Sequence, residues 1–287
     1  MAAPSRPLLR WHGGKWVAAP WIIAHFPPHR VYVEPFGGAA SVLLRKPRSY
    51  AEVYNDLDQE VVALLRVLRG PDAPELIRRL RLTPFARAEF DDAYAPGGDD
   101  LETARRLVVR SFMGFGSTSA LGRKPGFRAD SNRSGTPPAR DWTNYPDALQ
   151  AIVERLAGVV VENRPALEVM AAFDRPDALH YVDPPYMPET RGGAGKAVKH
   201  VYRHEMTVED HERLLQALQQ LAGFVVVSGY ATPLYDHALA GWLRVARPAR
   251  ADGARLREEI LWINPRCTAA LAACGGVQYD MTFAEAV

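Results

Sequence analysis

The chain has 287 residues, of which 47% are hydrophobic and 24% charged, the balance of an ordinary soluble globular protein. Its two cysteines, Cys267 and Cys274, exclude a disulfide framework and a four-ligand zinc site, and no apolar run approaches membrane-spanning length. We therefore expect a reduced, cytoplasmic protein without a metal site, a membrane segment or a secretion signal.

In chain order, short apolar runs alternate with longer segments of helical spacing. Five runs predict buried parallel strands, at 31–34, 51–54, 158–161, 179–182 and 224–228. Helical patterns follow at 39–46, 57–69, 165–172 and 207–221, and the last begins with a capping box of Thr207 and Asp210. Two further strands, at 242–247 and 257–263, predict an antiparallel hairpin at one edge. The alternation predicts an α/β fold with helices on both faces of the sheet.

Residues 70–150 interrupt this alternation. Short helices are expected over 70–113, whereas 114–141 is rich in Gly, Ser, Arg and Pro, and so long a loop is usually functional or disordered. We expect 1–69 and 151–287 to form one domain, with 70–150 inserted into it. Within the insertion, 105–140 carries eight Lys and Arg but one Asp, a local charge of +7 on a chain of net charge +2. This clustering indicates a patch that faces a polyanion, with a solvated basic surface as the alternative.

A strand, a tight glycine turn and a helix start follow one another in VYVEPFGGAAS, at 31–41. Glycines let the backbone approach a ligand, and the first turn of a helix offers free N–H groups. Asp56 ends the second strand, close to the spacing expected for an acid that binds ribose hydroxyls. Upstream, RWHGGKW at 10–16 makes a turn whose Trp11 is suited to packing on an adenosine and whose Lys15 is suited to holding a carboxylate. The absence of GxGxxG disfavours a nucleotide-dependent oxidoreductase.

The stretch YVDPPY, at 181–186, ends the fourth strand. Two consecutive prolines cannot donate ladder hydrogen bonds, so the strand stops there and holds Asp183 and Tyr186 at a stiff corner. The glycine turn and Asp183 both follow strands, which places both at the carboxyl edge of the sheet, where ligands bind in open α/β folds.

The order of WHGGK, EPFGG, Asp56, the basic insertion and DPPY resembles the Dam-type N6-adenine DNA methyltransferases. The resemblance implies a Rossmann-like methyltransferase sheet, S-adenosylmethionine as methyl donor and double-stranded DNA as substrate. It implies catalytic roles for Asp183, Pro184 and Tyr186, and cofactor contacts from Trp11, Lys15, Glu34, Phe36, Gly37, Gly38, Asp56 and Asp183. The family's turn usually reads FxGxG, but Ala40 stands at the second glycine here, and we expect it to adopt a right-handed helical φ.

The implied chemistry explains the corner. The lone pair of adenine N6 is delocalised into the ring, so acceptors aimed at its hydrogens favour attack on the methyl group. Asp183 supplies a side-chain oxygen, Pro184 a main-chain carbonyl, and Tyr186 a ring that stacks on the flipped base. DNA contacts are expected from Arg123, Lys124, Arg128, Arg191 and Lys199, and at least one of the first three is expected to read a base.

Other assignments stay open at this stage. Transfer to cytosine N4, to RNA adenine or to protein glutamine is an alternative within the same class, although an Asp at the first motif position favours adenine. A non-catalytic DNA-binding protein on a methyltransferase scaffold is an alternative from another class. The sequence does not specify the recognition site, a restriction endonuclease partner or the oligomeric state.

Overall fold

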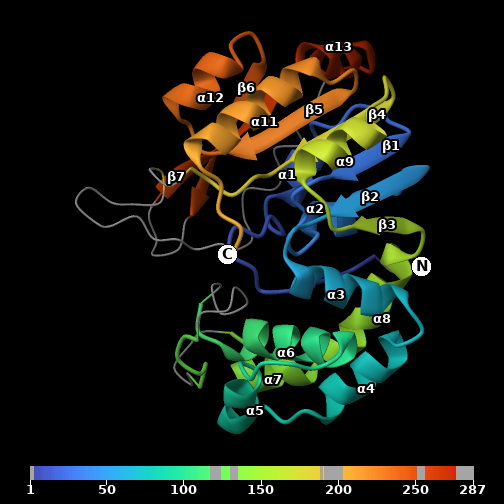
Figure 1. Cartoon of the computed structure of the whole chain (residues 1–287), viewed down its shortest axis with the longest axis vertical. Helices are drawn as coiled ribbons and strands as arrows, with labels where there is room; N and C mark the ends of the chain where they lie inside the picture. Colours follow the sequence, from blue (N-terminus) through green and yellow to red (C-terminus); the bar gives the residue numbers. More distant parts are fainter. Residues whose placement is uncertain are drawn as a thin grey trace.

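A seven-stranded sheet forms the centre of the protein, in the order β3-β2-β1-β4-β5-β7-β6 (Figure 1). The computed structural model describes residues 3–116, 124–129, 135–187, 190, 203–250 and 256–275. The strands are β1 Val31–Glu34, β2 Ala51–Asn55, β3 Val159–Glu162, β4 Ala178–Val182, β5 Phe224–Gly229, β6 Leu243–Arg250 and β7 Leu256–Ile263. β1 to β5 pair in parallel, while β7 pairs antiparallel with both β5 and β6. The predicted α/β sheet with an antiparallel C-terminal hairpin is confirmed.

Helices connect these strands. They are α1 Ala19–Ile23, α2 Ser41–Arg45, α3 Gln59–Arg69, α4 Ala73–Leu82, α5 Arg87–Asp92, α6 Asp100–Met113, α7 Pro138–Thr143, α8 Tyr145–Leu156, α9 Ala166–Phe173, α11 Val208–Gln220, α12 Pro233–Ala238 and α13 Pro265–Ala273. Six of them, α3 to α8, follow one another between β2 and β3. The capping box of Thr207 and Asp210 is confirmed at the start of α11. The helices α1, α7, α8, α12 and α13 were not predicted, and the expected domain boundary at 150/151 falls within α8.

Strand side chains alternate between two apolar layers, as the pleat requires. On β1, Tyr32 belongs to one hydrophobic cluster, whereas Val31 and Val33 belong to another on the opposite face. On β5, Val226 and its neighbours Val225 and Val227 divide in the same way. Because both faces are apolar, the parallel strands read as continuous hydrophobic runs, which is why the sequence predicted them well.

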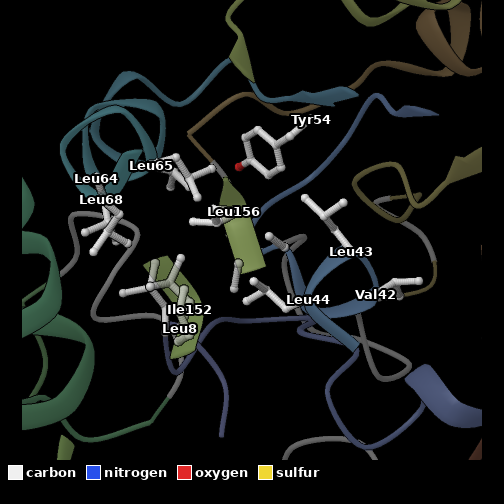
Figure 2. Packing of buried hydrophobic residues seen from close by; sticks show 14 of the residues in the cluster. Leu8, Val42, Leu43, Leu44, Tyr54, Leu64, Leu65, Leu68, Ile152 and Leu156 are labelled. Atoms are coloured by element: carbon white, nitrogen blue, oxygen red, sulfur yellow. The ribbon is translucent and has the colours of Figure 1, made fainter. Parts of the chain in front are cut away.

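One hydrophobic cluster is continuous from the sheet into the inserted helices. Figure 2 shows side chains from α2, α3 and α8 meeting beside Tyr54 of β2. The same cluster includes Leu107 and Phe112 of α6, and Trp142 of α7. In Figure 1 the helices α4 to α8 gather beyond the β3 edge of the sheet, at the bottom of the view. The insertion is thus packed on the sheet and shares its core.

A buried ion cluster joins α2, β2 and α8. Glu52 of β2 binds the Lys46 ammonium at 2.7 Å, and Arg155 of α8 binds both Glu52 oxygens, at 2.6 and 2.9 Å. The Glu52 side chain is only 3% exposed. Charges removed from water to this extent are stable only while they are paired, so the cluster ties β2 to the end of α8.

The strand order reverses between β1 and β4. From β1 the sheet continues to β2 and β3 in one direction, and from β4 to β5 in the other. At such a switch point the loops after the two strands diverge and leave a crevice at their carboxyl ends. The loops concerned are the glycine turn after β1 and the DPPY corner after β4.

Candidate active site

A cavity of about 380 Å³ lies at this switch point. It is lined by residues from both predicted motifs, namely Trp11, Lys15, Glu34, Phe36, Gly37, Gly38, Asp56, Asp183 and Pro184. The structure therefore brings together every predicted cofactor residue in a single pocket. The pocket also has a wall that was not predicted, formed by 165–167 and by 203–206.

The glycine turn is shaped by close contacts. A Cβ on Gly37 would lie 2.0 Å from the Tyr54 ring, whose hydroxyl donates to the Gly38 carbonyl at 2.7 Å. Gly38 has φ +46°, and a Cβ there would lie 2.9 Å from Trp11 Nε1. Side chains are therefore excluded at both positions, and the turn runs directly beside Trp11 and the cavity.

The expectation for Ala40 was wrong. Its φ is +55° and its ψ is +30°, the left-handed conformation rather than the right-handed one, and α2 begins only at Ser41. The Ala40 amide donates to the Gly37 carbonyl at 2.7 Å, which closes the turn and imposes this conformation. Ala40 is fully buried in the hydrophobic cluster, so its methyl group packs into the core.

Asp56 supports the turn from β2. Its Oδ2 accepts from the Gly38 amide at 2.8 Å and its Oδ1 accepts from the Asp58 amide at 2.8 Å. Burial raises the pKa of Asp56 to about 6, although both amide hydrogen bonds oppose the shift. Each carboxylate oxygen keeps a further lone pair, so the group can still accept from ligand hydroxyls in the cavity.

Glu34 ends β1 as a buried acid. Its Oε2 accepts from the Tyr32 hydroxyl at 2.7 Å and from the Leu43 amide at 3.0 Å. Burial raises the pKa of Glu34 to about 8 in spite of these donors. The residue is therefore mainly protonated at neutral pH and provides a hydrogen-bond donor as well as acceptors on the cavity wall.

Asp183 is held at both oxygens. Lys15 Nζ lies 2.9 Å from Oδ2, and the Ser228 hydroxyl donates to Oδ1 at 2.8 Å. Because the single hydrogen of Ser228 is used in this bond, the Tyr181 hydroxyl, 2.9 Å from Ser228 Oγ, is the donor in its own contact. Burial raises the pKa of Asp183, while Lys15 opposes the shift. A buried carboxylate with fixed donors is a preorganised acceptor.

Lys15 holds two carboxylates of the protein itself. Its ammonium contacts the carboxylates of Asp183 and Glu259, at 2.9 and 3.5 Å, and donates to the Gly13 carbonyl at 3.0 Å. Burial acts to lower the pKa of Lys15, but the two carboxylates outweigh burial and raise it well above the usual value. Lys15 is therefore a fixed cation beneath the Asp183 carboxylate.

Tyr186 is held by polar contacts at its hydroxyl and by packing of its ring. The hydroxyl accepts from Lys15 at 2.5 Å and donates to Glu259 at 2.9 Å, while the ring packs against Tyr230 with centroids 4.5 Å apart. Its stacking on a base remains a prediction. Glu259 and Ser228 were not predicted as site residues. Each lies two positions from a core residue on its strand, Glu259 from Leu261 and Ser228 from Val226, so the alternation of the strand places each on a core-facing side.

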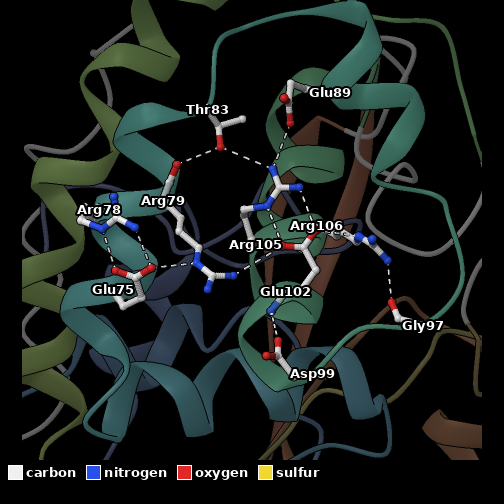
Figure 3. A network of polar contacts seen from close by, with 10 residues as sticks. All are labelled: Glu75, Arg78, Arg79, Thr83, Glu89, Gly97, Asp99, Glu102, Arg105 and Arg106. Carbon is white, nitrogen blue, oxygen red and sulfur yellow. Dashed lines mark hydrogen bonds and ion pairs between the residues drawn. The ribbon is translucent and has the colours of Figure 1, made fainter.

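The basic insertion is less free than its charge suggested. Figure 3 shows Arg105 bound by Glu102 and Glu89, and Arg106 bound by Glu102 and by the Gly97 carbonyl. Arg110 is buried and donates to Glu60 and to the Ala93 carbonyl. Arg105, Arg106 and Arg110 therefore have protein partners, and the partners named here all precede residue 105 in the chain.

The residues expected to contact DNA are only partly placed. Arg123, Arg191 and Lys199 lie outside the described residues. Lys124 pairs with Asp91 at 2.8 Å, with half of its side chain exposed, and Arg128 lies 3.9 Å from Asp141 with 11% exposed. Their roles stay predictions. Within the described ranges no helix is long and apolar enough to cross a membrane. In the same part of the chain, no cluster of three or more His, Cys, Asp or Glu is placed to hold a metal.

A mainly parallel sheet with a cavity at its switch point, an acid after β2 and a fixed carboxylate after β4 is typical of α/β enzymes that bind a nucleotide-containing cofactor. The chain belongs to the D12 class N6 adenine-specific DNA methyltransferase family, whose model matches residues 11–246. The predicted family is confirmed, and the protein is thus a methyltransferase.

Other comparisons add little. Among solved structures, the chain is similar to the crystal structure of an rRNA methylase from Streptococcus thermophilus, with 10% sequence identity. The match covers 86% of this chain and 94% of that chain, with a TM-score of 0.32, too low to support a conclusion. No curated protein gives a significant match.

Proposed function

We propose that this protein is a site-specific DNA methyltransferase that transfers a methyl group from S-adenosylmethionine to N6 of an adenine flipped out of the duplex. The observation that carries the proposal is the placement of Asp183 on the cavity that also contains Asp56 and the glycine turn. The DNA substrate implies a cytoplasmic location.

The residues around the cavity suit S-adenosylmethionine. Asp56 is placed to accept from ribose hydroxyls, Trp11 offers a ring for the adenine of the cofactor, and the glycine turn lets the backbone approach closely. When bound, the cofactor supplies an electrophilic methyl group on a sulfonium centre. Lys15 has two carboxylates of its own, so the cofactor carboxylate is expected to find another donor.

Asp183 acts on the attacking nitrogen. The carboxylate and the Pro184 carbonyl accept the two N6 hydrogens, which favours a pyramidal nitrogen and stabilises the positive charge that grows on it. The cofactor, when held beside Asp56 and the glycine turn, would supply the methyl group that this nitrogen accepts, and the resulting methylated ammonium would release one proton to Asp183 or to solvent. Because that ammonium is strongly acidic, Asp183 need not be a strong base.

The target base must leave the duplex to reach Asp183. Extrusion costs a few kcal/mol, and stacking of the base on an aromatic ring returns about 1–3 kcal/mol. Tyr186, next to the two prolines, is the proposed ring.

One experiment separates the candidate reactions. The protein is incubated with methyl-labelled S-adenosylmethionine and with DNA, RNA or protein, and the labelled product is digested and identified. The proposal expects label in N6-methyladenine of double-stranded DNA. Label in N4-methylcytosine, RNA or glutamine would replace it by an alternative reaction. DNA binding without any label would favour the non-catalytic DNA-binding protein.

Replacement of Asp56 by asparagine is expected to weaken cofactor binding by about 10- to 100-fold, the value of a hydrogen bond to a charged acceptor. The asparagine NH₂ group would also face the Gly38 or the Asp58 N–H group, so two donors would meet without an acceptor. Since the Asp56 pKa is about 6, wild-type affinity should fall as the pH drops through this value, and the variant should lack that dependence. Calorimetric titration with cofactor measures both effects. The exposed Asp72 provides the control, as Asp72→Asn, and equal affinity of the Asp56 variant and this control would remove the assigned role.

Base reading by the insertion is tested at Arg123, Lys124 and Arg128. Loss of a side chain that contacts phosphate lowers the affinity for all duplexes alike and reduces the slope of log affinity against log salt by roughly 0.9. Loss of a side chain that reads a base costs about 1–3 kcal/mol on the cognate site alone. We expect at least one of Arg123→Ala, Lys124→Ala and Arg128→Ala to show the second pattern, measured by binding to cognate and scrambled duplexes at several salt concentrations. Arg78→Ala on α4 controls for the general loss of charge. Equal losses on both duplexes for all three variants would move recognition elsewhere in the protein.

A further inference from the structure

Glu259 is a buried carboxylate on an apolar face of β7. Its side chain is 8% exposed, and Leu261 and Ile263, two and four residues further on, belong to the hydrophobic core. A carboxylate at such a position is stable only when it is paired and hydrogen-bonded. Its partners are the Lys15 ammonium, at 3.5 Å, and the Tyr186 hydroxyl, which donates to it at 2.9 Å. Both partners belong to the motifs that build the active site.

We propose that Glu259 is a positioning residue for methyl transfer, which holds Lys15 and Tyr186 so that the Asp183 carboxylate and the Tyr186 ring keep their places beside the target base. This inference rests on the proposed function. Glu259 lies in the part of the chain beyond residue 246, where the family match ends, and it acts through its neighbours rather than on the base itself.

Glu259 affects the charge balance around Asp183. Lys15 lies between two carboxylates, so the three groups together carry one net negative charge. If Glu259 were neutral, the ammonium would be compensated by Asp183 alone, and its full attraction would draw electron density from the oxygen that must accept an N6 hydrogen. Glu259 shares the ammonium and thereby leaves Asp183 a stronger acceptor.

Glu259 also fixes the orientation of the Tyr186 side chain. The Tyr186 hydroxyl has one hydrogen, which goes to Glu259, while its oxygen accepts from Lys15 at 2.5 Å. With the Tyr230 ring on its side, at 4.5 Å between centroids, Tyr186 is held by contacts at its tip and along its ring. A stacking platform held in advance loses little conformational entropy when the base arrives.

The electrostatic part predicts the sign of a pH effect. The charged and titratable groups that act on Asp183 are Lys15 beneath it, Glu259 on β7, Tyr181 on β4, Glu34 on β1 and Tyr235 on α12. Lys15 lowers the pKa of Asp183 and Glu259 raises it. Loss of the Glu259 charge therefore lowers the pKa of Asp183 and moves the acid limb of the pH–kcat profile to lower pH.

The decisive variant is Glu259→Gln, which keeps the shape and an oxygen for Tyr186 but removes the charge. We expect kcat at neutral pH to fall by roughly 10- to 100-fold, because Asp183 becomes a weaker acceptor, with the acid limb displaced to lower pH. Cofactor affinity, measured by calorimetry, should stay within about threefold. The neighbouring Glu258 is exposed, and Glu258→Gln is the matched control, expected to leave kcat and its pH profile unchanged.

The experiment distinguishes failure of the role of Glu259 from failure of the proposed function. If the wild-type protein methylates DNA adenine and Glu259→Gln keeps its kcat and its acid limb, the inference fails while the proposed function stands. If the wild-type protein does not methylate DNA adenine, the proposed function fails. Should Glu259→Gln not fold, Glu259→Asp serves instead, because it retains the charge but withdraws it from Tyr186. It should lower kcat and leave the acid limb in place, and a kcat equal to that of the wild type would overturn the inference.

Discussion

Replacement of Asp183 by asparagine is expected to reduce methyl transfer to DNA adenine by about 100- to 1000-fold or more, the loss typical of removing one preorganised transition-state contact. Asparagine keeps the shape of the side chain but has a single oxygen and an NH₂ group. Lys15 and Ser228 both donate to Asp183, so the remaining oxygen cannot serve them and the N6 hydrogens together. Single-turnover measurements with labelled cofactor give the rate of the chemical step directly.

The Asp183→Asn protein is expected to remain folded and to bind cofactor, which circular dichroism and calorimetry measure. Asp177→Asn is a suitable control, because Asp177 forms an exposed ion pair with Arg175 away from the cavity. A single-turnover rate within a few-fold of the wild type would exclude Asp183 as the acceptor. Loss of cofactor binding together with activity would instead assign it a role in cofactor binding alone.

The largest expected effect on stability comes from Glu52→Gln. The substitution leaves the Lys46 and Arg155 cations buried without their carboxylate, and removal of one member of such a cluster costs about 3–5 kcal/mol. Urea unfolding monitored by circular dichroism measures the change. Glu168→Gln removes an exposed partner of Arg164 and is expected to change the free energy of unfolding by less than about 1 kcal/mol. Equal effects of the two substitutions would show that the buried cluster adds nothing to stability.

The same cluster makes stability depend on pH. Burial opposes ionisation of Glu52, but the hydrogen bonds from Arg155 and Lys46 outweigh burial and lower the pKa of Glu52 below its ordinary value of 4.5. The contribution of Glu52 to the free energy of unfolding is therefore fully present above the pKa of the unfolded state. It is lost as the pH falls through the lower pKa of the folded state. The Glu52→Gln protein should lack this part of the acid destabilisation. Burial lowers the pKa of Lys46, although the neighbouring Glu52 carboxylate opposes the shift.

The sequence was most informative at positions where the local structure permits few residue types. Apolar runs predicted β1, β2, β4 and β5 because those strands are buried on both faces, and the two prolines after Asp183 identified the end of β4. The glycine turn and Asp56 were found because a ligand-facing turn limits the side chains that fit. These residues meet at one cavity because consecutive parallel strands end at one edge of the sheet.

Contacts between distant segments could not be predicted. The pairing of Glu259 with Lys15 depends on β7 lying antiparallel beside β5, an arrangement set by packing rather than by any local pattern. The left-handed conformation of Ala40 depends on how tightly the turn closes. The charge of the insertion was overestimated as a free patch because its window began at Arg105, just after Glu102. The three- and four-residue spacings from Glu102 to Arg105 and Arg106 already indicated pairing on a helix.

For an insertion that reads DNA, as proposed above, the core that it shares with the sheet limits how target preference can diverge. A recognition unit with its own core can be exchanged between proteins as a cassette. Here, removing 70–150 would strip apolar partners from α3 and expose side chains such as Leu64 and Leu68 to water. New DNA preferences are therefore expected to arise by point substitution on the outer surface of the inserted helices and loops, with the inner faces kept constant, and chimaeras built by swapping the segment should retain their fold only when α3 is exchanged with it.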